Sequence, residues 1–150
     1  MTENTGTVDE TVNSNSFNRS VIQEFRENSG KVGGFGDIPL LLLTTAGRRS
    51  GLTRTTPLVH LERDGLHIVF AANGGSPVPP GWYLNLVAAG QGVVEVGTER
   101  FPVKPVAVPE AEHEELWELQ TAQDPNFATF RDKTDRAIPV VALVPVTDAG

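Results

Sequence analysis

Cysteine is absent from this chain of 150 residues, and methionine and tyrosine occur once each. The absence of cysteine excludes disulfides, thiolate metal sites, iron–sulfur clusters and cysteine nucleophiles. No stretch approaches the roughly 18 uninterrupted apolar residues of a membrane-spanning helix. Met1 is followed by threonine, glutamate and asparagine rather than by the basic and apolar segments of a secretion signal. We therefore expect a soluble, cytoplasmic protein without membrane contact.

Positive charge is also scarce, with 12 basic residues against 19 acidic ones and a formal net charge of −7. Such a surface repels nucleic acid and anionic lipid, so we expect no nucleic-acid partner, and any anion site must be local. Residues 1–16 hold three acids, no base and mostly small polar residues, which predicts a disordered tail. The remaining residues, 17–150, have the length of one domain with one hydrophobic core.

The apolar pattern predicts strands more often than helices. Phe17, Val21, Ile22 and Phe25 repeat at helical spacing, so a helix should begin at Phe17 and end near Ser29. Strands are expected at 39–45, 53–61, 66–72, 93–97, 101–108 and 138–144, and further helices at 80–89, from 109 onward and at 125–131. Short turns join most of these five or six strands. We therefore expect an α+β, mainly β fold, in which an antiparallel sheet closes into a small barrel capped by short helices.

The segment 47–54, GRRSGLTR, concentrates positive charge in a predicted hairpin turn. It holds Arg48, Arg49 and Arg54 without a single acid. Guanidinium groups match phosphate geometry, the turn offers outward N–H groups and Ser50 adds a hydroxyl, so the segment is a candidate anion site. The alternative is a solvated hairpin tip, because arginine and glycine are ordinary turn residues.

Two further segments could lie beside this turn. Asn73 and the glycines after it end a predicted strand, where glycine lets the backbone approach a ligand closely; the alternative is an ordinary turn. Trp82 and Tyr83 stand at a predicted helix start, where the rings and the free N–H groups could flank an anion. The alternative is that one of the two rings packs into the core.

Hydrolytic and metal sites are not indicated. His60, His67 and His113 lack metal-ligand spacing. Ser50 lies in GRRSG rather than in a GxSxG elbow, and the acids at 110–118 are most simply the solvated face of a helix. The residues therefore predict no catalytic side chain.

Six segments taken together resemble a known family. They are VIQEFRENSGKVGG at 21–34, LLLLTTAGRRSGLTRTTPL at 40–58, AANGG at 71–75, PGWYLNL at 80–86, VEVG at 94–97 and FATFRDKTDRAIPVVAL at 127–143. In order and spacing they are similar to the actinobacterial, deazaflavin-dependent nitroreductases and quinone reductases that use coenzyme F-420. The resemblance implies the split β-barrel fold of that family.

The resemblance also implies a ligand, because coenzyme F-420 carries a phosphate and a polyglutamate tail on its deazaflavin. The positions that would bind it here are Arg48, Arg49, Ser50, Arg54, Thr55, Thr56, Pro57, Leu58, Val59, Ala71, Ala72, Asn73, Gly81, Trp82, Tyr83, Leu84, Asn85 and Phe127. An acidic protein can still focus positive potential on such a pocket. The cofactor would supply the hydride, so no side-chain nucleophile or metal is needed.

The acceptor site departs from the nitroreducing members. Asp124, Phe127 and Phe130 stand where those members carry tyrosines, and Ala72 and Asn73 stand where they carry serine and lysine. Because fewer donors weaken polarisation of a nitro oxygen, we expect a quinone-like or other conjugated, electron-poor acceptor. Two alternatives stay open, namely a non-catalytic carrier of F-420 and a split barrel that binds FMN or haem. The sequence does not indicate the oligomeric state.

Overall fold

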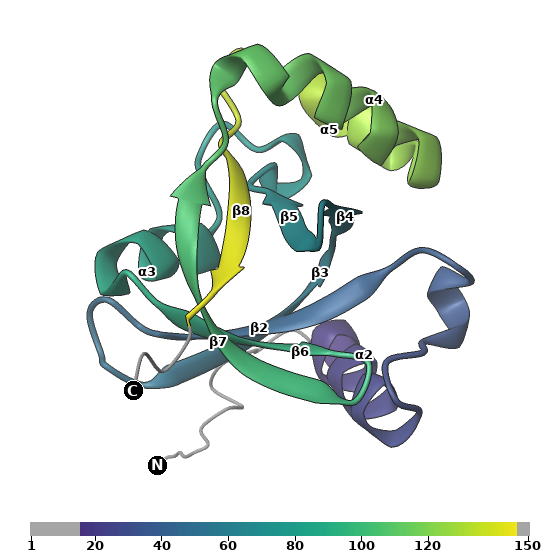
Figure 1. The fold of residues 1–150 in the computed structure, drawn as a ribbon, viewed down its shortest axis with the longest axis vertical. Helices are drawn as coiled ribbons and strands as arrows, with labels where there is room; N and C mark the ends of the chain where they lie inside the picture. Colours follow the sequence, from purple (N-terminus) through teal and green to yellow (C-terminus); the bar gives the residue numbers. More distant parts are fainter. Residues whose placement is uncertain (1–15, 147–150) are drawn as a thin grey trace.

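The computed structural model describes residues 16–146 (Figure 1). The predicted tail, residues 1–16, therefore lies outside the described residues except for Ser16, where the first helix begins. The helical elements are α2 (Ser16–Glu27), η1 (Gly33–Phe35), η2 (Asn73–Gly75), α3 (Gly81–Ala89), η3 (Glu110–Glu112), α4 (His113–Gln123) and α5 (Asn126–Asp132). The strands are β2 (Leu40–Ala46), β3 (Thr53–Val59), β4 (Leu61–Arg63), β5 (Leu66–Phe70), β6 (Gly92–Val96), β7 (Glu99–Ala107) and β8 (Val140–Pro145).

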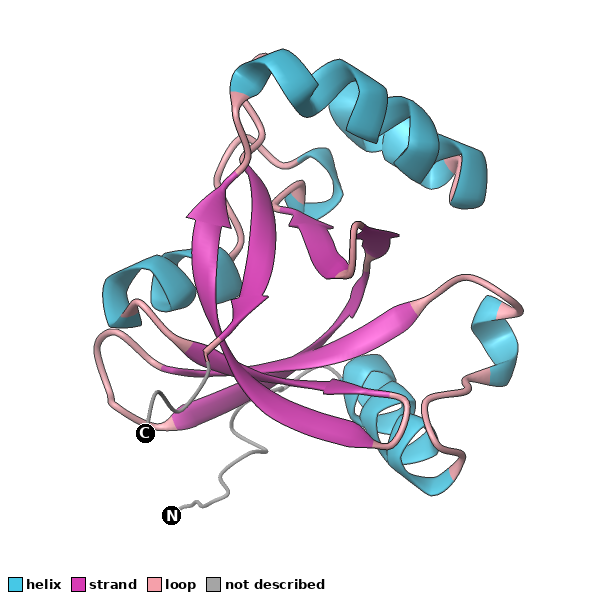
Figure 2. Cartoon of the chain, in the orientation of Figure 1, coloured by secondary structure: helices cyan, strands magenta, loops and turns pink. Residues whose placement is uncertain are grey.

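All seven strands belong to one antiparallel sheet with the order β3-β2-β6-β7-β8-β5-β4. The sheet curls on itself, with short helices around it (Figure 2), so the predicted mainly-β barrel is confirmed. The expected five or six strands were too few. The segment 53–61 breaks at His60, whose N–H donates to Pro39 O at 3.1 Å, and the chain turns there from one edge of the sheet to the other.

Several further boundaries differ from the sequence prediction. The last strand begins at Val140 rather than Ile138, and Pro145 belongs to it instead of breaking it. Pro145 is opposite Val103 at the end of the ladder, where a missing N–H is tolerated. The helix expected from Pro109 starts as the 3-10 turn η3 and becomes α-helical only at His113.

The continuous leucine run of β2 is buried on both faces. Leu41 and Leu43 pack inside the barrel with Val69 and Leu143, whereas Leu40 and Leu42 pack outward against α2. Leu41, Leu42 and Leu43 are 0% exposed, and each such side chain contributes about 1.5–3 kcal/mol of transfer free energy. This strand therefore fixes the position of the turn that follows it.

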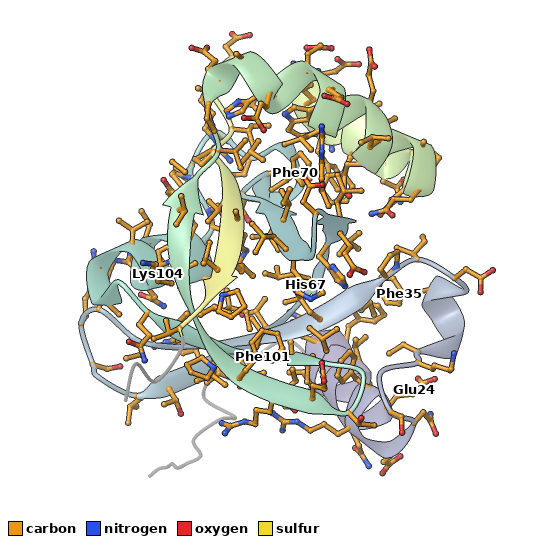
Figure 3. All side chains as sticks on the ribbon, viewed as in Figure 1. Glu24, Phe35, His67, Phe70, Phe101 and Lys104 are labelled. Atoms are coloured by element: carbon orange, nitrogen blue, oxygen red, sulfur yellow. The ribbon has the colours of Figure 1, made fainter. Side chains whose placement is uncertain are left out.

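The helices occupy separate ends of the barrel. α4 and α5 cover β5 at one end, and Figure 3 shows Phe70 beneath these helices. The ring centroids of Phe70 and Trp117 are 4.8 Å apart. α2 lies under β2 and β3 and is joined to β6 by the Arg26–Glu95 ion pair at 2.8 Å. Within residues 16–146, no helix is both long enough and apolar enough to span a membrane.

Candidate functional site

The turn between β2 and β3 is shaped by its own backbone. Gly47 N–H donates to Leu52 O at 2.7 Å, and Gly51 N–H donates to Gly47 O at 2.8 Å. Ser50 Oγ accepts from Leu52 N–H at 3.1 Å, so this hydroxyl supports the turn. A Cβ added at Gly47 would lie 2.9 Å from Ser50 Oγ and 3.2 Å from Arg54 Nε. Glycine is therefore needed here for close approach.

The arginines of this turn are partnered unequally. Arg48 donates twice to Asn85 Oδ1, from its backbone N at 3.1 Å and from Nη1 at 2.8 Å. Asn85 is buried in α3, so Arg48 ties the turn to that helix. The side chains of Arg49 and Arg54 form no ion pair or hydrogen bond with residues 16–146. Their charge is therefore free to attract an anion.

A cavity of about 440 Å³ opens between this turn and the start of α3. Its lining contains three guanidinium side chains and no carboxylate: Gly47, Arg48, Arg49, Ser50, Arg54, Thr56, Asn73, Pro80, Gly81, Trp82 and Asn85. We call it the arginine cavity. Because nothing in the lining balances these charges, it is a site of positive potential in an acidic protein.

A second cavity of about 380 Å³ adjoins the first, and we call it the apolar cavity. Its lining is mostly aromatic and aliphatic: Phe35, Thr56, Pro57, Leu58, Val59, Phe70, Ala72, Asn73, Gly74, Pro80, Trp82, Asp124, Asn126, Phe127 and Phe130. Thr56, Asn73, Pro80 and Trp82 line both cavities. A molecule with an acidic end and a flat apolar end can therefore span the two.

Asp124 is the one carboxylate in the apolar cavity. It is 6% exposed, and its Oδ1 accepts from Asn126 N–H at 3.2 Å, which caps the start of α5. Phe127 and Phe130 follow on that helix with ring centroids 5.1 Å apart. The cap therefore sets the direction in which both rings enter the cavity wall.

Most of the residues predicted for the site line one of the two cavities, but four do not: Thr55, Ala71, Tyr83 and Leu84. Thr55 lies on the opposite face of β3, where its Oγ1 is 2.8 Å from Thr44 Oγ1. Ala71 is fully buried, and the Tyr83 ring packs into the barrel core. Consecutive residues of a strand point to opposite faces, so Thr55 points away from the arginine cavity that Arg54 and Thr56 line.

The structure adds lining residues that sequence reasoning did not select: Gly47, Pro80, Gly74, Phe35, Phe70 and Asn126. Gly47, Gly74 and Pro80 lie inside the segments that resemble the family, so those segments could have indicated them as lining residues. Phe35 follows the glycines of η1 and reaches the cavity only through the path of that link. No pattern in the sequence indicates this path.

The histidines lie outside both cavities. His60 and His67 form a partly buried pair with their Nδ1 atoms 3.2 Å apart, and Figure 3 shows His67 in the middle of the molecule beside Phe101. Burial, and then the neighbouring His67, lower the pKa of His60 from 6.5 to about 4. Within residues 16–146, no group of three or more histidine, cysteine or acidic side chains could hold a metal ion.

Comparison with known proteins places this arrangement in a family. A family model described as "F420H(2)-dependent quinone reductase" matches residues 17–145. The chain belongs to this family. The predicted resemblance to the deazaflavin reductases is thereby confirmed.

Individual relatives agree with this assignment. The "F420H(2)-dependent quinone reductase Rv1261c" of Mycobacterium tuberculosis is 35% identical over 124 residues, which cover 79% of this chain and 83% of the relative. A solved "F420-H2 Dependent Reductase (FDR-A)" is 35% identical with a TM-score of 0.63, over 70% of this chain and 93% of that chain. A chain solved as a domain-swapped dimer is 30% identical with a TM-score of 0.64, over 83% and 94%. These likenesses also confirm the split-barrel fold.

Proposed function

We propose that this family member binds coenzyme F-420 in its reduced form and passes a hydride to a quinone-like acceptor. The observation that supports this most directly is the junction of the two cavities. One is lined by three arginines without a counter-charge, the other by aromatic rings, and four residues are common to both. A coenzyme with an acidic tail and a flat ring requires such a pair of adjoining sites.

The residues of the arginine cavity fit the acidic part of the coenzyme. Arg49 and Arg54 have no partner within residues 16–146, so a phosphate or carboxylate would not have to displace one. Arg48 is already oriented by Asn85, which reduces the ordering cost of binding. Gly81 and Trp82 add the N–H groups at the start of α3, where the helix dipole favours anions.

The residues of the apolar cavity fit a conjugated acceptor beside the ring. When bound, the coenzyme supplies a hydride, and with one proton from water a quinone becomes a hydroquinone. The chain contributes placement and the exclusion of water, which are the main protein contributions to hydride transfer. Phe127 and Phe130 of α5 line this space together with Ala72, Asn73 and Gly74 of the neighbouring loop.

Asp124, Phe127 and Phe130 also bear on which acceptor is used. They would contact the acceptor, and none of them carries the phenolic hydroxyl that nitroreducing relatives place at these positions. Because the rings offer no donor to polarise a nitro group, we propose quinones rather than nitroaromatics as the acceptors. The non-catalytic carrier is the second candidate, since the acceptor site lacks these hydroxyls.

A triple replacement of Arg48, Arg49 and Arg54 by alanine tests the coenzyme site. Each charge-assisted hydrogen bond contributes about 1.5–3 kcal/mol, so the loss of even two should raise the Kd of F-420 at least 100-fold, measured by deazaflavin fluorescence. The control is Arg131→Ala, because Arg131 pairs with Glu114 away from both cavities. Unchanged affinity in the triple variant would refute the placement.

Turnover separates an enzyme from a carrier. Wild-type protein is mixed with reduced F-420 and menadione, coumarins or nitroaromatics in turn, and recovery of the oxidised coenzyme absorbance is followed. Oxidation by menadione is expected. Tight binding without turnover on any acceptor would support the carrier and exclude the reductase. Parallel titrations with FMN and haem test the remaining alternative.

Source and location follow as further parts of this proposal. The mycobacterial origin of the curated relative supports an actinobacterial source, and a cytoplasmic location is consistent with the absence of a spanning helix in residues 16–146. The solved domain-swapped relative makes the oligomeric state worth measuring by light scattering.

A further inference from the structure

Arg136 lies outside both cavities but binds a loop that lines them. This arginine belongs to the link between α5 and β8. Its Nε donates to Ser76 O at 3.0 Å, and its Nη2 donates to Ala71 O at 3.0 Å and to Ala72 O at 3.1 Å. The three carbonyls come from the two ends of one short segment, residues 71–76. One guanidinium therefore holds the two ends of this segment together.

The 71–76 loop carries one wall of the proposed reaction site. Ala72, Asn73 and Gly74 line the apolar cavity, and Asn73 also lines the arginine cavity. The loop has left-handed backbone at three consecutive residues, with φ of 50° at Asn73, 63° at Gly74 and 87° at Gly75. Glycine adopts such φ without strain, whereas the left-handed conformation of Asn73 persists only where the surroundings fix it.

The opposite side of the same loop is held by α5. A Cβ placed on Gly75 would lie 2.7 Å from Lys133 Cβ and 2.8 Å from Phe130 O, so loop and helix are in direct contact. The loop is thus held between α5 and the Arg136 guanidinium. Phe130, on this helix, also lines the apolar cavity. The placement of the lining residues on the loop therefore depends on both supports.

The charge of Arg136 is directed only at carbonyl oxygens. Within residues 16–146 it takes part in no ion pair with a carboxylate. Arg131, five residues earlier, instead pairs with Glu114 at 2.8 Å and lies 5.1 Å from the Trp117 ring centroid. Hydrogen bonds from a charged donor are stronger than neutral ones, and the planar fork reaches several acceptors at once.

We propose that Arg136 is a positioning residue for hydride transfer, one that fixes the 71–76 loop against which coenzyme ring and acceptor are aligned. It touches neither reactant. The proposal rests on the proposed function, because it assigns Arg136 a part in that reaction. A misplacement of about 1 Å can cost roughly 100-fold in rate, so the effect of a loosened loop should appear in the chemical step.

The test compares Arg136→Ala with wild type, with the conservative Arg136→Lys and with the matched control Arg131→Ala. At saturating reduced F-420 and menadione, the rate of hydride transfer in stopped flow should fall about 10- to 100-fold in Arg136→Ala. Arg136→Lys should lie between, because an ammonium has no fork to reach three carbonyls. The Kd of F-420 should change less than about threefold, since the three arginines of the arginine cavity are unchanged. Arg131→Ala should match wild type.

Chemical rescue distinguishes positioning from general damage. Arg136 borders a separate cavity of about 680 Å³ under α4, also lined by His113, Thr134 and Pro139, through which a small cation can reach the vacated position. Guanidinium chloride at low, non-denaturing concentration should restore part of the rate in Arg136→Ala and none in Arg131→Ala. A structural defect alone would be worsened by guanidinium.

The outcomes separate the two proposals. Suppose that wild type oxidises reduced F-420 with menadione. If the rate of Arg136→Ala is then within twofold of wild type, or falls only in proportion to its folded fraction by circular dichroism, the positioning role is overturned. The reductase proposal is unaffected by that result. If wild type binds F-420 but does not turn over, the reductase itself is refuted. Should Arg136→Ala fail to fold, Arg136→Lys decides, and a rate within twofold of wild type overturns the role.

Discussion

Replacing Gly75 by alanine should destabilise the protein more than the same change at the adjacent Gly74. Both glycines have positive φ, 63° at Gly74 and 87° at Gly75, so each alanine accepts a left-handed conformation that costs roughly 1–2 kcal/mol. At Gly74 the new methyl group meets nothing within 4 Å, whereas at Gly75 it meets Lys133 Cβ at 2.7 Å and Phe130 O at 2.8 Å. Such overpacking adds about 1–3 kcal/mol.

The measurement is the free energy of unfolding of the two variants by urea titration, with a thermal melt in parallel. Gly75→Ala should lose about 2–5 kcal/mol in total and Gly74→Ala about 1–2. At about 2–4 °C per kcal/mol for a chain of this size, the two melting temperatures should differ by at least about 2 °C. Equal losses in the two variants would refute direct contact between the 71–76 loop and α5.

Two further predictions concern His60 and Phe130. Burial and His67 lower the pKa of His60 in the folded protein to about 4, from 6.5 when it is solvated. Between pH 6.5 and 4, His60 therefore binds a proton in the unfolded chain but not in the folded one. The free energy of unfolding should fall as the pH drops through this range. The difference corresponds to at most about 3 kcal/mol; urea titrations across this range should show a shallower loss in His60→Gln, and an unchanged slope would show that His60 does not contribute. Phe130→Tyr places a hydroxyl at the half-buried wall of the apolar cavity and should raise the rate with nitroaromatic acceptors about 2- to 10-fold through one added hydrogen bond, measured by oxidation of reduced F-420. Phe101→Tyr is its control, since that ring lies 6.3 Å from the His67 ring and lines neither cavity; equal gains in both variants would contradict the assignment of Phe130 to the acceptor wall.

The sequence predicted the elements of the fold because their signals are local. The strand expected at 39–45, the strand expected at 66–72 and the helix expected at 80–89 each depend on neighbours within a few residues, and each element lies close to its expected range. His60 is different. Its N–H is bonded to Pro39, a partner distant in sequence, so the break between β3 and β4 could not be read from a continuous β-branched run.

The sequence motifs predicted which segments form the candidate site, but not which way each side chain points. The arginine turn and Trp82 line the arginine cavity as expected. Thr55 and Ala71 do not line either cavity, because the strand pleat and the burial of Ala71 direct these residues into the protein. Arg136 lies in the segment 127–143, which resembles the family, but nothing in the sequence set it apart from its neighbours. Its role depends on three carbonyls about 60 residues earlier, and carbonyls leave no trace in the residue pattern.

Strand β3 ends the order of the sheet, so one of its two long edges has no strand beside it. An uncovered edge is a template on which a second molecule can add a strand and begin to aggregate. Five consecutive residues of β3, TRTTP at 53–57, include a charged arginine and end in a proline, which has no N–H to offer to an incoming chain. The strand that borders both cavities can therefore keep an open side toward small ligands while resisting polymerisation.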